Sequence, residues 1–338
     1  MPATLPDRFL AMALTEAGTR RLQAIEVPMR ALAPGQLRLR VHACGVCRTD
    51  LHLVDGELEA AALPRVPGHE IVGTVVECAP GSSRFAPGER VGVPWLAGTC
   101  GHCGYCDSGR ENLCADATFT GYSVDGGYAQ FATVNQAFAF AIPPGYDDEH
   151  AAPLLCAGLI GYRALSMLPG ANAIGIYGFG AAGHLVAQVA LAQGRRVFAF
   201  TRRGDDAAQS LARDLGVTWA GDSTEPAPSP MDGAILFAPA GELVPVALRQ
   251  IAPGGTVVCA GIHMSDIPSF PYRWLWKERC LRSVANLTRT DGEAFLQWAA
   301  AHPLRLATTS YPLVRANDAL DDLRAGRIAG VAVLNCLN

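Results

Sequence analysis

Two cysteines and a histidine, far apart in the sequence, have the side-chain types that catalytic chemistry needs. Cys47 ends a Cys-Gly-Val-Cys segment, His69 stands in Gly-His-Glu, and Cys156 follows Pro-Leu-Leu. Two thiolates and one imidazole suit a catalytic zinc ion, because such sites keep a fourth position open for water or substrate. Zinc there would polarise a bound alcohol or carbonyl for hydride transfer. Glu70 is expected to lie behind the ion or to enter its coordination transiently.

A second group of cysteines has the spacing of a structural zinc site. Four thiols lie close together with glycines between them: Cys100, Cys103, Cys106 and Cys114. Four thiolates in a tetrahedron form the closed type of zinc site, which stabilises a fold. Disulfides or free thiols are the alternatives. The first residues lack the basic start and apolar core of a secretory signal, so we expect a reducing compartment that disfavours disulfides.

Hydroxyl and imidazole side chains follow Cys47 at a spacing that suits a proton relay. A proton that leaves a buried alcohol can pass to the hydroxyl of Thr49 and then to His52, because imidazole exchanges protons near neutral pH. Asp50 is the candidate acceptor for the second ring N–H of the metal-bound histidine.

For Cys44 and Cys47 the alternative is a redox dithiol. Such a motif opens a helix after a strand near a βαβ unit, whereas this one is expected in a β-rich region.

A glycine-rich run downstream, Gly-Phe-Gly-Ala-Ala-Gly, fits a dinucleotide-binding turn. It follows an apolar strand predicted at residues 173–177 and precedes a helix predicted at residues 184–193. In this fingerprint Gly178 makes the tight turn, Gly180 admits the pyrophosphate, and Gly183 lets the helix pack on the strand. Backbone N–H groups at the start of the helix then face the phosphates. An ordinary glycine-rich turn is the alternative.

The end of the next predicted strand bears on the choice of cofactor. An NAD site usually places Asp or Glu there to bind ribose hydroxyls, but this chain has Thr201, Arg202 and Arg203. Two guanidinium groups suit the 2′-phosphate of NADP. We therefore expect this segment to bind NADP, with NAD as the alternative. Solvated arginines that pair with Asp205 and Asp206 are the other interpretation.

Composition limits the class of protein. The chain has 338 residues, of which 50% are hydrophobic and 17% are charged, and this suits two domains with large cores. The formal net charge of −4 gives no basic footprint for nucleic acid. No apolar run is long enough to span a membrane. We therefore expect a cytoplasmic protein that acts on a small molecule and has an apolar subunit interface.

The hydrophobic pattern predicts two regions of different architecture. Short β-rich runs bounded by Pro-Gly turns dominate the chain as far as about residue 150. From residue 153 strands alternate with helices, which is typical of an α/β domain with a doubly wound parallel sheet. This alternation ends near Leu287. Strands are predicted over residues 36–44, 71–76, 90–93, 197–200, 234–237 and 256–260.

Together the motifs resemble the zinc-dependent alcohol dehydrogenases of the medium-chain dehydrogenase/reductase superfamily, in particular its compact microbial, yeast-like branch. The resemblance lies in Cys-Gly-Val-Cys-Arg-Thr-Asp-Leu-His, Gly-His-Glu, the four-cysteine stretch and Pro-Leu-Leu-Cys-Ala-Gly. It implies a GroES-like, β-rich catalytic domain formed by residues 1–152 and 288–338. Residues 153–287 would form a Rossmann dinucleotide-binding domain inserted between these parts.

The resemblance also implies roles for single residues. Arg48 would contact the cofactor pyrophosphate, and Thr49 and His52 would form the proton relay. A homo-oligomer, either a tetramer or a dimer, is implied as well. Near the C-terminus, related enzymes often carry an arginine where this chain has Val331. Without that arginine, which helps to hold the cofactor in related enzymes, the pyrophosphate would be bound more weakly, or Arg327 or Arg48 would contribute more to its binding.

The sequence favours an oxidoreductase, a zinc-dependent alcohol dehydrogenase or aldehyde reductase. It would transfer a hydride between a zinc-bound primary alcohol or aldehyde and NADP(H), with one catalytic and one structural zinc per chain. The alternatives are the same chemistry with NAD(H), an enoyl or quinone reductase without catalytic zinc, and a non-catalytic dinucleotide-binding regulatory protein on the same scaffold. The intact ligand set of Cys47, His69 and Cys156 argues against the reductase, and the intact relay argues against the regulatory protein.

Overall fold

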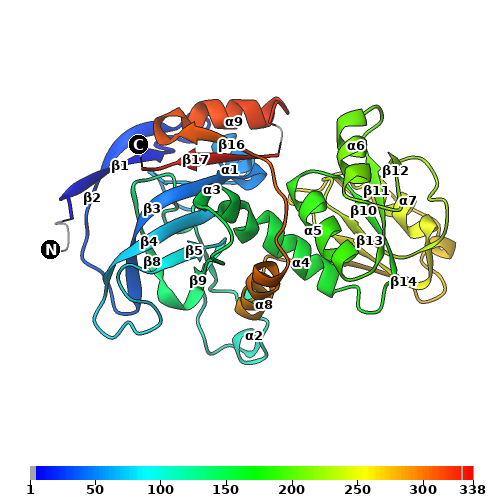
Figure 1. The fold of residues 1–338 in the computed structure, drawn as a ribbon, viewed down its shortest axis with the longest axis horizontal. Helices are drawn as coiled ribbons and strands as arrows, with labels where there is room; N and C mark the ends of the chain where they lie inside the picture. The colour runs from blue at the N-terminus through cyan, green and yellow to red at the C-terminus, as the bar shows by residue number, and fades with distance from the viewer. Residues whose placement is uncertain (1–4, 329, 338) are drawn as a thin grey trace. The chain divides into compact units, whose positions relative to one another are not determined.

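The computed structural model describes residues 5–328 and 330–337. The chain divides into two compact units, unit 1 from Met1–Cys156 and Asn286–Asn338 and unit 2 from Ala157–Ala285. Unit 1 contains both ends of the chain, drawn blue and red in Figure 1, and unit 2 is the segment inserted between them. This α/β architecture agrees with the expected fold class.

Unit 1 is built on a mostly antiparallel sheet. Its strands lie in the order β16-β17-β3-β4-β5-β9, and β8 also pairs with β3. β16 and β17 pair in parallel, whereas the other neighbours are antiparallel. The antiparallel pairs β1–β2 and β6–β7 belong to the same unit. The bounds are β1 (Arg8–Ala13), β2 (Gln23–Pro28), β3 (Gln36–Val46), β4 (Ile71–Cys78), β5 (Arg90–Val93), β6 (Leu96–Gly98), β7 (Thr118–Phe119), β8 (Phe131–Asn135), β9 (Phe140–Ala141), β16 (Thr308–Pro312) and β17 (Val331–Asn335).

Short helices and 3₁₀ turns connect these strands. The turn η3 contacts β3, β4 and β5, so residues 153–155 pack on the sheet of unit 1. For this reason the first boundary between the units lies after Cys156 and not after residue 152. The bounds are α1 (Arg48–Val54), α2 (Gly104–Asp107), α3 (Asp148–Ala151), α8 (Arg289–Ala301), α9 (Ala316–Arg324), η1 (Glu111–Leu113), η2 (Gln136–Phe138), η3 (Ala152–Leu155) and η5 (Leu313–Arg315).

The strand β3 is longer and more deeply buried than the sequence suggests. Alternating polar residues predict a half-buried strand over residues 36–44, but β3 continues to Val46 and most of its side chains are buried. Arg38 is only 3% exposed, because its guanidinium donates to Thr133 Oγ1 and to a backbone carbonyl oxygen. Its Nε also lies 3.7 Å from Glu77 Oε2. A polar residue of an alternating strand sequence can therefore be buried when neighbouring strands supply its hydrogen-bond and ion-pair partners.

Unit 2 contains a parallel sheet of six strands in the order β12-β11-β10-β13-β14-β15. Counted along the chain this order is 3-2-1-4-5-6, that of the doubly wound dinucleotide-binding fold. Ligands of such sheets bind beyond the carboxyl ends of the strands where the order reverses, here between β10 and β13. The bounds are β10 (Ala173–Tyr177), β11 (Arg196–Thr201), β12 (Trp219–Asp222), β13 (Met231–Leu236), β14 (Ile251–Cys259), β15 (Cys280–Ser283), α4 (Ala157–Ser166), α5 (Ala181–Ala192), α6 (Asp206–Asp214), α7 (Leu243–Gln250) and η4 (Tyr272–Trp274).

Apolar packing fixes the strand ends of unit 2. β10 is buried along its whole length, and Tyr177 stacks on Phe200 of β11 with ring centroids 4.1 Å apart. Full burial of one such side chain contributes about 1.5–3 kcal/mol. The helix α5 begins at Ala181, earlier than the predicted start at residue 184. The reason is that Gly180 is its N-cap and Gly183 lies inside its first turn.

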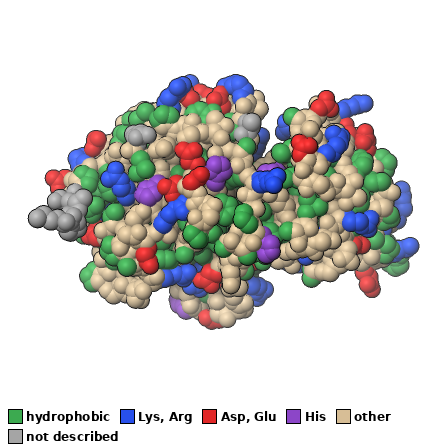
Figure 2. Space-filling model, viewed as in Figure 1, with side chains coloured by type: hydrophobic (Ala, Val, Ile, Leu, Met, Phe, Trp, Pro, Cys, Tyr) green, Lys and Arg blue, Asp and Glu red, His purple; other side chains and the backbone are tan. Residues whose placement is uncertain are grey.

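The surface agrees with the modest net charge. On the face drawn in Figure 2, acidic and basic side chains are interspersed and do not gather into a basic stripe. Within residues 5–328 and 330–337, no helix combines the length and the apolar character needed to cross a bilayer.

Candidate active site

Cys47 stands where β3 ends and α1 begins. It is the N-cap of α1, and its backbone N–H donates to Asp50 Oδ2 at 2.9 Å. Cys47 thus lies at the start of a helix that follows a strand, as in a redox dithiol motif, whereas the sequence predicts β structure here. The two cysteines of this segment have different surroundings. Cys44 Sγ donates to the carbonyl oxygen of Gly45 at 3.7 Å, whereas Cys47 Sγ lies 3.7 Å from Cys156 Sγ.

The pairing of β3 with β4 brings His69 to Cys47. In this antiparallel pair the last residues of β3 lie opposite the first residues of β4, so the segments just beyond both strand ends meet. Asp50 bridges the two segments, because its Oδ1 accepts the N–H of Gly68 at 3.1 Å and lies 3.4 Å from His69 Nδ1. The predicted contact between Asp50 and His69 is therefore present as a close pair, without hydrogen-bond geometry.

Four side chains converge here, with their ligand atoms within 4.8 Å of one another: Cys47, His69, Glu70 and Cys156. His69 and Glu70 are almost completely buried. Among the described residues, Glu70 Oε2 has no hydrogen-bond partner, and a Cβ atom on Gly45 would overlap this oxygen. An unsatisfied buried polar atom costs about 1–3 kcal/mol. The cluster, which we call the first cluster, is therefore suited to a positively charged guest.

The pKa shifts in the first cluster reflect crowded negative charge. A hydrogen bond from the Cys156 thiol, aided by His69, holds the pKa of Cys47 well below its usual range. The hydrogen bond to Cys47 and burial raise the pKa of Cys156, while burial and the Cys47 thiolate raise the pKa of Glu70. Burial opposes a charged His69, but Asp50 and Cys47 outweigh it and raise the pKa of His69. A bound cation would lower the raised pKa values of Cys156, Glu70 and His69 and would favour the thiolate of Cys47 further.

The predicted relay residues lie on α1. Thr49 is buried, and its Oγ1 lies 3.8 Å from Cys47 Sγ. His52 lies three residues further along, on the same face of the helix, and is hydrogen-bonded through Nδ1 to Glu57. The helix therefore leads from the buried cluster toward a partly exposed imidazole. Arg48, the first residue of α1, is exposed.

An aromatic group lies beside the first cluster. Trp95 packs edge-on against His69, with ring centroids 5.0 Å apart, and stacks on Phe119 at 5.2 Å and on Tyr122 at 5.9 Å. The ribbon β6–β7 holds these rings together, and all three are half-buried. Sequence reasoning misses Phe119 and Tyr122. Their one signal is the aromatic-rich stretch that follows the fourth cysteine of the second group.

The second group of cysteines also converges. All four Sγ atoms lie within 4.8 Å of one another, with separations of 3.6 Å for Cys103–Cys106, 3.6 Å for Cys100–Cys114 and 3.9 Å for Cys100–Cys106. These distances are much longer than a disulfide bond of about 2.05 Å. Hydrogen bonds from the Thr99 hydroxyl and neighbouring thiols lower the pKa of Cys106 to about 7. The loop therefore presents one thiol that ionises readily, beside three further sulfur atoms.

The glycine-rich turn has the steric features of a phosphate-binding turn. Gly178 has φ +92°, and a Cβ atom there would lie 2.7 Å from the Ala238 nitrogen. A Cβ atom on Gly183 would overlap the carbonyl oxygen of Gly178, whereas one on Gly180 would meet open space. The turn is thus tightly packed at Gly178 and Gly183 but open at Gly180, the N-cap of α5. Backbone N–H groups at such a helix N-terminus attract anions.

At the end of β11 the ion-pair partner of the arginines is not the one expected from the sequence. Thr201 is buried, and its hydroxyl lies 3.1 and 3.3 Å from the carbonyl oxygens of Arg202 and Gly221, so the residue is engaged within unit 2. Arg202 and Arg203 are exposed, and Arg203 Nε lies 4.0 Å from Asp222 Oδ2. Asp205 caps α6 and is not the ion-pair partner of Arg203. Asp222 is the last residue of the adjacent strand β12. The parallel pairing of β11 with β12 places it opposite Thr201.

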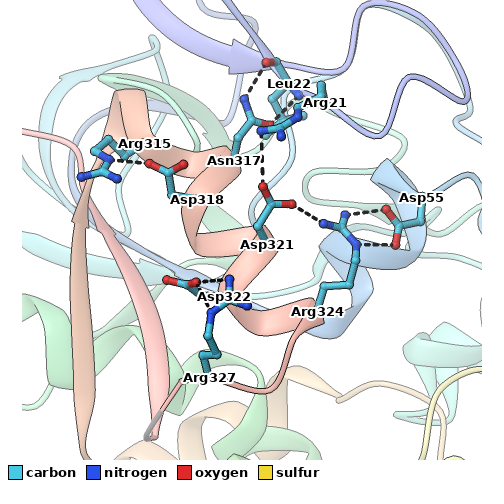
Figure 3. Close-up of polar contacts among 10 residues, drawn as sticks. All are labelled: Arg21, Leu22, Asp55, Arg315, Asn317, Asp318, Asp321, Asp322, Arg324 and Arg327. Carbon is cyan, nitrogen blue, oxygen red and sulfur yellow. Dashed lines mark hydrogen bonds and ion pairs between the residues drawn. The ribbon is translucent and has the colours of Figure 1, made fainter.

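Arg327 is already engaged within unit 1. Its Nε and Nη2 both donate to Asp322 Oδ1, at 2.8 and 2.6 Å, as Figure 3 shows. Two of its guanidinium nitrogens thus face Asp322 of α9, whereas Arg48 is exposed. Ala329, in the segment before Val331, lies outside the described residues.

Comparison with known proteins agrees with this geometry. Residues 33–144 match the family model of the alcohol dehydrogenase GroES-like domain. The chain is 48% identical over 324 residues to the probable alcohol dehydrogenase AdhA of Mycobacterium tuberculosis (strain CDC 1551 / Oshkosh), an alignment covering 94% of this chain and 93% of that protein.

Solved structures extend the likeness to the whole fold. A cinnamyl alcohol dehydrogenase of Sorghum bicolor, SbCAD4, matches with a TM-score of 0.89 and 26% identity, covering 97% of this chain and 98% of that one. The acetophenone reductase of Geotrichum candidum in complex with NAD matches with a TM-score of 0.88 and 25% identity, covering 98% of each chain. With its two converging metal-ligand clusters and its doubly wound sheet, this chain belongs to the alcohol dehydrogenase family of the medium-chain dehydrogenase/reductase superfamily.

Proposed function

We propose that the chain is a zinc-dependent alcohol dehydrogenase or aldehyde reductase that transfers a hydride between a primary alcohol or aldehyde and NADP(H). The observation that carries this proposal is the buried convergence of Cys47, His69, Glu70 and Cys156. Family membership alone does not decide function, because one scaffold can host catalytic and non-catalytic members.

The donor atoms fit zinc. In a tetrahedron with zinc–sulfur bonds of about 2.3 Å, sulfur atoms lie about 3.8 Å apart. The Sγ–Sγ separations are 3.7 Å for Cys47–Cys156 and 3.6–3.9 Å for three pairs in the second group. The first cluster adds an imidazole, which gives the Cys₂His ligand set known for catalytic zinc, whereas the second offers thiols alone. We therefore propose one catalytic and one structural zinc per chain.

The residues of the chain handle the proton. Zinc in the first cluster supplies the Lewis acidity that polarises the substrate oxygen, and the nicotinamide ring exchanges the hydride. In alcohol oxidation the Thr49 hydroxyl accepts the proton of the substrate, and His52 passes a proton toward solvent. In aldehyde reduction the direction reverses. Asp50 fixes the backbone at Cys47 and at Gly68, so that the donor atoms are placed before substrate binds.

The aromatic group suggests the kind of substrate. The stacked, half-buried rings of Trp95, Phe119 and Tyr122 extend from the edge of His69. Such a wall excludes water and stacks on flat apolar groups. We propose that the substrate pocket takes aromatic primary alcohols and their aldehydes.

The cofactor proposal rests on unit 2. The open space over Gly180 admits a pyrophosphate, and β11 itself does not end in the Asp or Glu that usually binds the ribose of NAD. Arg203 is 96% exposed and pairs with Asp222 only at 4.0 Å, so its guanidinium can turn to a 2′-phosphate at little cost. We propose that Arg202 and Arg203 together make NADP the preferred cofactor.

The test of this function compares NADPH with NADH in reduction of benzaldehyde by the zinc-loaded protein. A tenfold or greater preference for NADPH in kcat/KM, about 1.4 kcal/mol, supports the arginine assignment. Equal use, or preference for NADH, leaves the zinc chemistry in place and makes NAD the cofactor. Replacing Arg202 and Arg203 by Ala is expected to raise the KM for NADPH far more than that for NADH, and an equal effect rejects the 2′-phosphate role.

A second experiment separates an enzyme from a non-catalytic dinucleotide-binding protein. Cys47→Ala is expected to abolish turnover while circular dichroism and the structural zinc stay as in the parent. Unchanged activity would exclude the first cluster as the catalytic site. A parent protein that binds NADPH but turns over no alcohol or aldehyde would favour the regulatory alternative.

We also propose a cytoplasmic homo-oligomer. Every cysteine of the chain is a free thiol, which suits a reducing compartment. The strand β15 ends the parallel sheet and is largely exposed, and exposed apolar residues lie on the segment before it: Ile262, Ile267, Tyr272 and Trp276. An open strand edge with apolar neighbours favours self-association. Light scattering coupled to size exclusion would distinguish a monomer from a dimer or tetramer.

A further inference from the structure

The chain folds back on itself directly after α1, against His52. Asp55 closes the helix, and its N–H donates to the carbonyl oxygen of Leu51 at 2.7 Å. Gly56 follows at φ +80°, a left-handed conformation that glycine adopts without strain. The N–H of Leu58 then donates to the carbonyl oxygen of His52 at 2.9 Å. These bonds fix a compact turn at the solvent end of the helix.

Glu57 lies in this turn and contacts the imidazole. Its Oε2 is hydrogen-bonded to His52 Nδ1, and the side chains of His52 and Glu57 are 16% and 57% exposed. A carboxylate can only accept, so Nδ1 is the ring nitrogen that carries the hydrogen. In a neutral imidazole the lone pair then resides on Nε2, which becomes the proton acceptor.

An ion pair from α9 holds the beginning of the same turn. Figure 3 shows Arg324 directed at Asp55, with Nε and Nη2 donating to the two carboxylate oxygens at 3.1 and 2.6 Å. Its Nη1 contacts Asp321 at 2.5 Å, and Asp321 pairs with Arg21 at 3.3 Å. A two-pronged guanidinium–carboxylate pair constrains direction as well as distance. The turn that carries Glu57 is therefore held at its base.

The helix α9 is itself anchored to the N-terminal hairpin. Asn317 accepts the N–H of Leu22 and donates to its carbonyl oxygen, both at 2.9 Å. Leu22 is buried in the core of unit 1. Arg324 thus acts from a fixed position, and the turn after α1 is not held by surface charges alone.

We propose that Glu57 is a positioning residue of the proton relay, which keeps His52 in the Nδ1–H tautomer so that Nε2 takes up the proton. This inference rests on the proposed function and on the relay role of His52. Imidazole in water exchanges between two tautomers, and a ring with hydrogen on Nε2 cannot accept a proton there. The carboxylate also stabilises the imidazolium as it forms, as an aspartate does for the histidine of a hydrolase triad.

The proton balance of this step is simple. In alcohol oxidation one O–H bond of the substrate breaks, and through Thr49 one N–H bond forms at Nε2 of His52. The imidazolium is then paired with the Glu57 carboxylate. The Nε2–H bond breaks to water or buffer, and the ring returns to its first tautomer. Glu57 keeps its charge throughout, while the electron pair of the hydride goes to the nicotinamide.

The test uses the zinc-loaded, full-length protein and the substitutions Glu57→Leu and Glu57→Gln. Glu57→Leu is expected to lower kcat about tenfold, part of the 10²–10⁴ that a positioned acid or base contributes. The KM for the alcohol should stay within about twofold, and the D₂O solvent isotope effect on kcat should rise, because proton removal becomes slower. Glu57→Gln keeps an acceptor oxygen and should recover at least threefold over Glu57→Leu.

Glu59→Leu is the matched control, since Glu59 is an exposed glutamate two positions further along the chain. It should leave kcat and the solvent isotope effect unchanged. An unchanged kcat in Glu57→Leu, an equal loss in both Leu variants, or no recovery by Gln would each overturn the inference.

A second readout does not depend on turnover. Nitrogen-15 spectra of histidine-labelled protein report which ring nitrogen carries hydrogen, and His52→Asn assigns the signal. The Nδ1–H tautomer is expected in the parent protein and should be lost in Glu57→Leu. If the protein oxidises no alcohol, the proposed function fails while this spectrum still tests the contact. An Nε2–H signal in the parent protein overturns the inference.

Discussion

Replacing Asp50 by Asn tests whether one buried carboxylate holds the first cluster together. Asp50 is 2% exposed and accepts the N–H groups of Cys47 and Gly68, at 2.9 and 3.1 Å. It also lies 3.4 Å from Nδ1 of His69. Asparagine has nearly the same shape, but its NH₂ group must face one of the two backbone N–H donors whichever way the amide turns.

The size of the effect follows from these contacts. A hydrogen bond to a charged group contributes about 1.5–3 kcal/mol, and an unsatisfied buried donor costs about 1–3 kcal/mol. The amide oxygen still accepts one N–H, so we expect Asp50→Asn to lower the free energy of unfolding by about 2–4 kcal/mol. The orientation of His69 is weakened as well. Loss of such support typically costs 10- to 100-fold in metal affinity, about 1.4–2.7 kcal/mol.

Two measurements check this expectation. Urea unfolding of the zinc-loaded protein, followed by circular dichroism and tryptophan fluorescence, reports the free energy of unfolding. Competition with a chromophoric chelator reports zinc affinity at the first cluster. Asp7→Asn is the control, because Asp7 is exposed in the same unit. If Asp50→Asn loses less than about 1 kcal/mol and binds zinc as Asp7→Asn does, the reasoning is refuted.

Three further substitutions probe other parts of the structure. Cys103→Ala should lower the zinc content from about two ions toward one per chain and reduce the Tm, as measured by emission spectroscopy and calorimetry; two retained ions would contradict a four-thiolate site. Gly45→Ala places a methyl group on a buried carboxylate of the first cluster, so urea unfolding should show a loss of about 1–3 kcal/mol, and parent-like stability would count against this packing. A hydrogen bond from His42 and the charge of Arg90 lower the pKa of Asp148, so this carboxylate stabilises the fold above its unfolded pKa and ceases to do so as pH falls. Asp148→Asn should therefore lower the Tm at pH 7 and cost progressively less below about pH 4; a pH-independent difference would contradict the linkage.

Local spacing was sufficient where all partners lie close in sequence. The thiols between Cys100 and Cys114 meet within one loop, and the strand, glycine turn and helix around Gly178 are contiguous. Covalent connectivity limits where such groups can go, so residue types and spacing predict their geometry. The same reasoning placed the start of α5 too late, because it treated Gly178 to Gly183 as one turn, whereas Gly180 is the N-cap and Gly183 already lies in the helix.

Burial could not be predicted where partners come from other strands. Arg38 alternates with apolar residues and reads as solvent-facing, yet Thr133 and Glu77 receive its guanidinium inside unit 1. Similarly, Asp222 reaches Arg203 only through the parallel register of β11 and β12. An alternating pattern says which face of a strand a residue occupies, but not which strand lies beside it.

The sequence by itself determined which side chains are able to bind a metal, a phosphate or a proton, because those capacities belong to the residue types. The tertiary structure decided which of them meet. The register of β3 with β4 brings His69 to Cys47, the packing of η3 on the sheet brings Cys156, and the turn after α1 brings Glu57 to His52. Hydrophobic burial is non-directional, so no local pattern specifies these pairings. They follow from the one packing that fills both cores and satisfies the buried polar groups.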